Sequence, residues 1–153
     1  MNSSLSSWSI YFVMLGPMVV FPALYMRHAA FFVCTLLTGM WVDAAMPAPF
    51  GLFTTLFLIA GTGIFHWRIR FRAEHNYHPS ILAHTINALA IIAITFTNGY
   101  ELIGVSSFWI QFGITLIASH LALLLIAPWF FNLQRLCIHI FHLESEPESF
   151  PTS

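Results

Sequence analysis

The chain has 153 residues, of which 58% are hydrophobic and 7% are charged, and its net charge at pH 7 is −1. A soluble domain carries charged residues at about a quarter of its positions. The composition therefore excludes a typical soluble enzyme or binding domain and predicts an integral membrane protein with no sizeable soluble part.

Five apolar segments are long enough to cross a bilayer as helices. We predict that they span residues 8–26, 29–46, 50–66, 81–97 and 107–131. Residues 1–131 are thus expected to form one all-α, polytopic transmembrane helical bundle. The amino-terminal "MNSSLSS" has no positive charge before its apolar run, so we interpret the first segment as a retained span and not as a signal peptide.

The first predicted span contains two prolines, and the last is unusually long. Pro17 and Pro22 predict a kink or a break in the first helix. The fifth span is longer than a bilayer needs and should tilt or emerge into the interface. After it, residues 132–143 have apolar side chains at helical spacing, which predicts a short amphipathic helix on the inner leaflet. Residues 144–153 are acidic and contain proline, and we expect a disordered tail.

The arginines predict the orientation. With five spans, every arginine falls on the same side of the membrane, in the segments after the first, third and fifth helices: Arg27, Arg68, Arg70, Arg72 and Arg135. The positive-inside rule makes that side cytoplasmic. We therefore expect the amino terminus outside, the carboxyl terminus inside, and a bacterial inner membrane as the location.

Asp43 is a carboxylate at the outer end of the second predicted helix, where the helix dipole disfavours negative charge. The next helix begins after a short turn, with Pro49 suited to its first turn and the free amides of residues 50–52 forming an anion-binding end. We expect Asp43 to join the two helices there, and Gly39, one turn earlier, to permit close backbone approach. The open alternative is that Asp43 binds a cation, a proton or a substrate.

The stretch "TGMWVDAAMPAPFGLFTTLFLIAG" resembles the core signature of the rod shape-determining protein MreD family. In that family a glycine, an aspartate four residues on and a glycine eight residues further join two successive helices, and Gly39, Asp43 and Gly51 match this pattern. The resemblance covers residues 30–66. Members usually have six spans with the amino terminus inside, so this chain is similar to a divergent member that lacks the first helix.

The resemblance implies a non-enzymatic scaffold of the bacterial cell-elongation machinery. Its expected partners would be an MreC-like periplasmic protein and, through it, MreB, RodA and a penicillin-binding protein, together with membrane lipids and no nucleic acid. MreD-like proteins are also similar in fold to the substrate-binding subunits of energy-coupling-factor transporters. The alternative function is therefore binding of a small molecule for transport, in an outer pocket lined by Asp43, Asn98 and Glu101.

His84, Asn87 and His120 are polar residues inside the fourth and fifth predicted spans. We expect them to form a shared polar packing network, since polar side chains hydrogen-bond between helices in membranes. A haem held by His84 and His120 is a second possibility, and a role in proton or ligand binding is a third.

The loop "HWRIRFRAEHNYHP" contains Arg68, Arg70 and Arg72, which we interpret as a basic orientation loop at the lipid headgroups. Its histidines, with Glu74, could hold a metal ion, but no fourth ligand or second shell can be identified. The sequence contains no recognisable catalytic motif. We expect no catalytic residue, no metal and no cofactor.

Overall fold

The computed structural model describes residues 13–68 and 78–141. Within them the chain forms five α-helices and one short 3₁₀ helix, which agrees with the predicted all-α class. Their bounds are α1 Gly16–Tyr25, α2 His28–Ala45, α3 Leu52–His66, α5 His78–Gly99, η2 Tyr100–Leu102 and α6 Ser106–Phe141.

Three of these helices, α2, α5 and α6, are long and apolar enough to cross a membrane. Several such helices in one chain make it a multi-pass membrane protein. The other two are shorter: α3 has 15 residues and α1 has 10. At 1.5 Å per residue, α3 is about 22 Å long and α1 about 15 Å, against a hydrocarbon thickness of roughly 30 Å.

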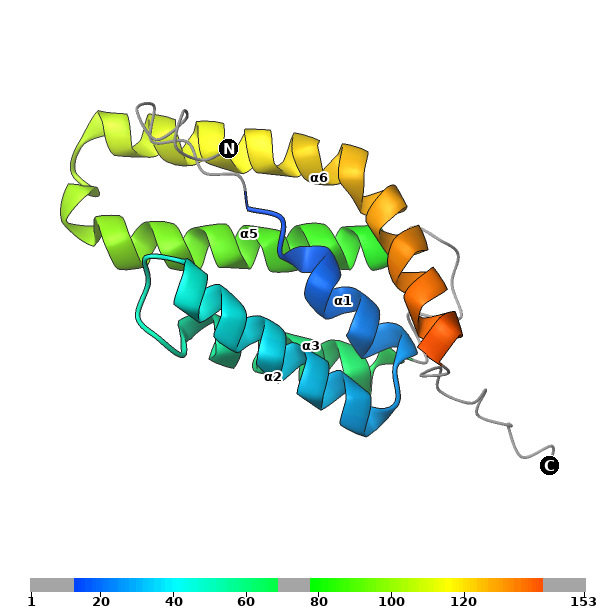
Figure 1. The fold of residues 1–153 in the computed structure, drawn as a ribbon. Helices are drawn as coiled ribbons and strands as arrows, with labels where there is room; N and C mark the ends of the chain where they lie inside the picture. The colour runs from blue at the N-terminus through cyan, green and yellow to red at the C-terminus, as the bar shows by residue number, and fades with distance from the viewer. Residues whose placement is uncertain (1–12, 69–77, 142–153) are drawn as a thin grey trace.

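The helices form two antiparallel pairs with α1 between them (Figure 1). Helix α2 packs along α3, α5 packs along α6, and α1 contacts all four. The core lies around α1, where Val19, Val20 and Leu24 are fully buried against residues of α3 and α5. Large apolar side chains cover the outside of α6, as expected for a surface that faces lipid.

The first predicted span begins later than expected. Residues 13–15 are not helical, and α1 begins at Gly16 with Pro17 in its first turn. Proline is favoured there, because the missing N–H would be unpaired anyway. At Pro17 the structure therefore has a helix start, whereas Pro22 lies inside α1, which continues to Tyr25. Residues 8–12 lie outside the described part of the chain.

The predicted amphipathic segment is not a separate helix. Helix α6 continues without a break through Pro128 to Phe141, and Figure 1 shows it bending in its second half. Proline removes one backbone hydrogen bond and clashes with the carbonyl four residues earlier, which explains the bend. The position of this segment on the inner leaflet, and the tail at 144–153, remain predictions.

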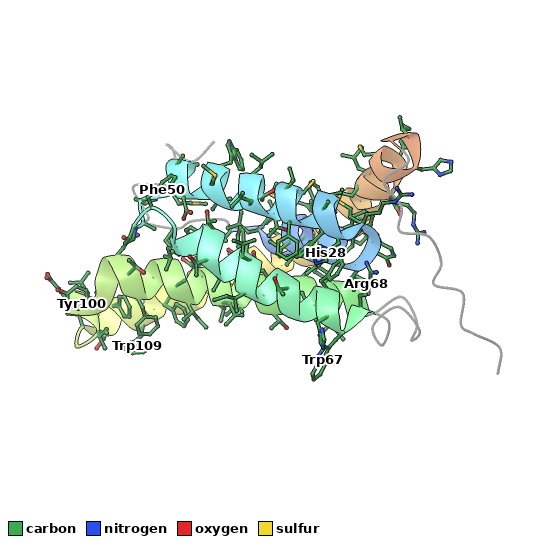
Figure 2. All side chains as sticks on the ribbon, turned by 90° about the horizontal axis from the view of Figure 1, so that it is seen from below. His28, Phe50, Trp67, Arg68, Tyr100 and Trp109 are labelled. Carbon is green, nitrogen blue, oxygen red and sulfur yellow. The ribbon has the colours of Figure 1, made fainter. Side chains whose placement is uncertain are left out.

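The described arginines lie at one end of the bundle. Arg68 donates from Nη1 to the carbonyl oxygen of Met26 over 3.2 Å, next to Arg27, which precedes α2. Arg135 lines a cavity together with Tyr25, the last residue of α1. Figure 2 shows Arg68 at this end and Tyr100 at the opposite end. Arg70 and Arg72 lie outside the described residues.

Candidate functional site

Asp43 is buried, with 4% of its surface exposed, and lies against the start of α3. Its Oδ1 accepts a hydrogen bond from the Phe53 amide at 2.8 Å. Its Oδ2 accepts from the Thr54 amide at 3.1 Å and from the Thr54 hydroxyl at 2.5 Å. The carboxylate thus caps the positive end of α3 and joins α2 to α3.

The amides that bind Asp43 differ from those expected. Phe53 and Thr54 are the donors at hydrogen-bond distance. Of the expected amides at residues 50–52, that of Gly51 also stabilises the charge of the carboxylate. The reason is that α3 begins at Leu52, so Pro49 lies in the preceding turn and not in the first turn of the helix. Gly51 takes a φ of 98°, a conformation that other residues adopt only at a cost.

Gly39 packs directly on the same part of α3. A Cβ atom added to it would lie 2.6 Å from the Cα atom of Thr54. The two backbones therefore approach more closely than any larger residue would permit. Gly39, Asp43 and Gly51 act together: the first admits the backbone, the second binds its amides and the third turns the chain into α3.

A second polar site lies halfway along α5 and α6, where α1 begins. The side-chain Oδ1 of Asn87 accepts a hydrogen bond from the Leu15 amide at 3.0 Å. The Ser119 hydroxyl accepts from the Val13 amide at 3.2 Å. Asn87 and Ser119 are both fully buried. They supply acceptors to the non-helical stretch before α1, where the backbone has no helical partners of its own.

His84 and His120 lie beside this site. Their rings are in edge-to-face contact, with centroids 5.1 Å apart and planes at 61°. His84 is one turn from Asn87, and His120 follows Ser119 in the sequence. A haem bound by both histidines would place its porphyrin between the two rings, which here touch each other. The structure thus brings the two histidine rings into contact, with Asn87 one turn away on α5. It shows no hydrogen bond at either His84 ring nitrogen, at His120 Nδ1 or at Asn87 Nδ2, so the predicted hydrogen-bonded network stays a prediction.

Sequence reasoning missed Ser119 and the stretch 13–15, which complete this cluster. Ser119 is one serine among several in the chain, and nothing in its neighbours marks it. The start of α1 had a signal, because Gly16-Pro17 is a typical helix start. Because the apolar run continues on both sides of this pair, the sequence alone predicts only a kink or a break there.

We expect Asn87→Ala to lower the free energy of unfolding by about 1–2 kcal/mol, because the Leu15 amide would lose its buried acceptor. The measurement is unfolding of the purified protein in mixed micelles. Thr85→Ala is the control: the exposed Thr85 hydroxyl bonds to the carbonyl of Ile81 in its own helix, so the change should be under about 0.5 kcal/mol. Equal effects of the two variants would contradict the assigned contact.

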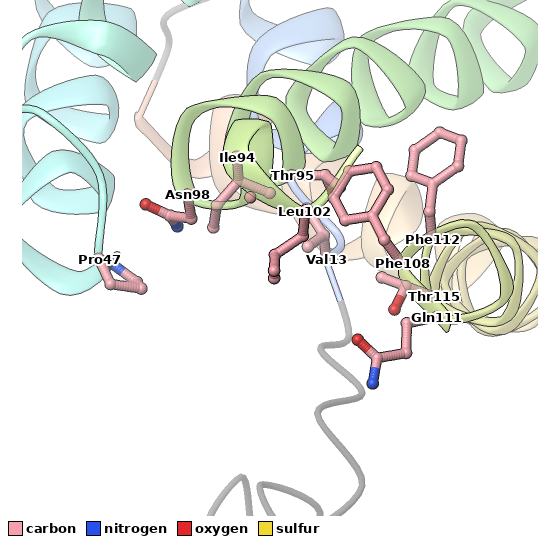
Figure 3. Close-up of a pocket in the computed structure, with 11 residues that line it drawn as sticks. Val13, Pro47, Ile94, Thr95, Asn98, Leu102, Phe108, Gln111, Phe112 and Thr115 are labelled. Atoms are coloured by element: carbon pink, nitrogen blue, oxygen red, sulfur yellow. The ribbon is translucent and has the colours of Figure 1, made fainter. Parts of the chain in front are cut away.

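The largely apolar pocket in Figure 3 has a volume of about 180 Å³ and lies between α5 and α6, near the η2 connection that joins them. Phe108, Phe112 and other apolar side chains form most of the wall, and Asn98 and Gln111 supply amide groups. Asn98 therefore lines a pocket, as the small-molecule-binding alternative predicts. Asp43 does not line this pocket, since it is bonded to α3, nor does Glu101, which is exposed and bonded to Tyr100.

The other predicted features of the arginine-bearing end are only partly described. His66 is exposed at the end of α3. Glu74 and His75 fall outside the described residues, as does the side chain of His78. Across residues 13–68 and 78–141, no three histidine, cysteine or acidic side chains are close enough to hold a metal ion.

Comparison with protein-family models, with curated proteins and with solved structures finds no match.

Proposed function

We propose that this multi-pass protein is a non-enzymatic scaffold of the bacterial inner membrane, similar in role to the MreD family. The observation that carries the proposal is that Asp43 is hydrogen-bonded to the start of α3. Its two oxygens bind Phe53 and Thr54 at the start of α3, so the carboxylate is used to fix a hairpin and both oxygens have partners. A rigid hairpin at one end of the bundle suits a docking surface.

The geometry of the hairpin agrees with the residues that carry the resemblance. Gly39 permits the approach of the Thr54 backbone, and Gly51 supplies the turn with positive φ. Phe50, in the turn between α2 and α3, lies at the end opposite Arg68 (Figure 2). If the arginines lie on the cytoplasmic side, the hairpin faces the periplasm, with the amino terminus outside and the carboxyl terminus inside.

The partner expected at the hairpin is an MreC-like periplasmic protein. Through it the chain would help to couple MreB filaments to wall synthesis by RodA and a penicillin-binding protein. No reaction is assigned to the chain itself, and no catalytic residue is needed.

Co-purification from native membranes tests this proposal. We expect the tagged protein to recover an MreC-like protein together with wall synthases in mild detergent. Asp43→Ala should lose most of this recovery and disturb rod shape, whereas Glu101→Ala removes an exposed carboxylate at the same end and should retain both. Normal rods and normal recovery with Asp43→Ala would refute the hairpin as the docking surface.

The alternative is a small-molecule-binding subunit of an energy-coupling-factor-type transporter. The pocket beside Asn98 favours it, because mainly apolar walls with a few amide groups are typical of ligand sites. In the same co-purification, recovery of an ATPase pair with its membrane coupling subunit would support this alternative and overturn the scaffold.

A further inference from the structure

His84 and His120 are half-buried side chains with buried ring nitrogens, and neither the hairpin nor the outer pocket uses them. Both Nδ1 and Nε2 of His84, and Nδ1 of His120, are buried and have no hydrogen-bond partner. The Nδ2 atom of Asn87, one turn from His84, is also buried and unpartnered. Neither histidine lines the outer pocket. The two rings are in direct edge-to-face contact, with centroids 5.1 Å apart.

A proton shared between the two rings would give a hydrogen-bond partner to one nitrogen of each ring, whereas in the structure the rings are in edge-to-face contact and these nitrogens are unpartnered. Each neutral ring has one donor and one acceptor nitrogen, and a protonated ring has two donors. An N–H⁺···N hydrogen bond between a protonated and a neutral ring is charge-assisted and therefore stronger than one between neutral rings. A second proton would place two positive charges side by side, which strongly disfavours its binding.

We propose that His84 and His120 form a proton-binding site inside the bundle, which takes up one proton and shares it between the two rings. The ligand is H⁺, and the pair titrates as one unit. An ionisable group inside a membrane bundle is expensive to maintain and typically serves a function. The site depends only on the contact between α5 and α6, and not on the proposed partners.

No described counter-charge lies beside the pair. The titratable neighbour that acts on His120 is His84. The other described titratable side chains on the elements packed around the pair lie at or beyond helix ends, or past Pro128 in α6: Tyr25, Arg27, His66, Arg68, Tyr100, Glu101, Arg135, Cys137 and His139. The charge of a bound proton therefore remains uncompensated within the described part of the bundle.

That charge would act on the start of α1. The amino-terminal end of a helix carries a positive partial charge, and α1 begins at Gly16, next to the cluster. Asn87 and Ser119, which hold the Leu15 and Val13 amides, are the immediate neighbours of the two histidines. Proton uptake should therefore repel the start of α1 and loosen residues 13–15, and proton release should restore their docking.

The test is a pH titration of the full-length protein in zwitterionic lipid nanodiscs, with ring-¹⁵N-labelled histidine observed by NMR. We expect the His84 and His120 signals to change together with one proton taken up. In His120→Gln, the coupled uptake should be lost, because the proton then has no second ring with which to be shared. His139→Gln, an exposed histidine on the same helix, should leave it unchanged. Independent midpoints in the wild-type protein, or no titration of either ring, would overturn the proposal without relying on a variant.

Two further measurements complete the test. Exchange protection of the Val13 and Leu15 amides, corrected for the intrinsic pH dependence of exchange, should fall about tenfold on protonation, within the usual range of coupling between sites. Unchanged protection would overturn the link to α1. The titration is repeated with EDTA and with one equivalent of Zn²⁺. If EDTA abolishes the coupling and Zn²⁺ restores it, the pair is a metal site and the proton assignment is wrong.

Discussion

Replacing Asp43 with alanine is expected to lower the free energy of unfolding by about 3 kcal/mol. The change removes three hydrogen bonds to a buried carboxylate, two of them from the amides of Phe53 and Thr54. Bonds to charged groups contribute about 1.5–3 kcal/mol each and are not additive. The two amides would also lose their partners at the start of a helix. Unfolding in mixed micelles, followed by circular dichroism, measures the effect.

Two variants make the Asp43 experiment specific. Asp43→Asn keeps an acceptor oxygen for one amide and loses the charge, so its loss of stability should lie between those of the wild type and alanine. Glu101→Ala removes an exposed carboxylate and should change stability by less than about 0.5 kcal/mol. An alanine variant at position 43 that is as stable as the wild type would show that the hairpin does not depend on the carboxylate.

The second large effect is expected at Gly16, the first residue of α1. A Cβ atom at this position would overlap the carbonyl oxygen of Ala83 in α5. Because both partners are backbone, neither can move aside as a flexible side chain would. Gly16→Ala should therefore force α1 away from α5 and cost about 3 kcal/mol, at the upper end of typical overpacking. The same unfolding measurement applies, together with the exchange rate of the Leu15 amide, which the displacement should increase.

Gly113 in α6 provides the matched control. A Cβ atom there meets nothing within 4 Å, so Gly113→Ala should be neutral or stabilise the helix by up to about 1 kcal/mol, as alanine does in helix interiors. Similar losses at positions 16 and 113 would indicate a general intolerance of alanine for glycine, and would argue against a specific contact between α1 and α5.

The hairpin was the most predictable part of the molecule, because its contacts are local in sequence. Asp43 and Thr54 are 11 residues apart, and a helix end, a short turn and a helix start already place them together. The predicted set of donor amides was wrong because one helix boundary was wrong. Helix α3 begins at Leu52, so the amides of Phe53 and Thr54 lie in its first turn and bind Asp43. Helix boundaries are the least reliable element of such predictions.

The cluster around His84 was less predictable, since its contacts are long-range. The bond from Val13 to Ser119 joins residues 106 positions apart, and that from Leu15 to Asn87 joins residues 72 apart. Similar depth could be inferred from span boundaries, but hydropathy does not say which face of α5 meets α6. The late start of α1 was hidden for the same reason, because an apolar extended segment and an apolar helix have the same composition.

The sequence by itself determined that this is an all-α, multi-pass membrane protein and approximately where its helices lie, and it favoured a role for Asp43 in joining its helix to the start of the next. These conclusions follow from composition, apolar length and local electrostatics, which act along the chain. Only the tertiary structure decided that α1 begins inside the bundle, that Asn87 and Ser119 hold the stretch before it, and that His84 meets His120. Those contacts arise when helices distant in sequence pack and must satisfy buried polar groups where little water is available.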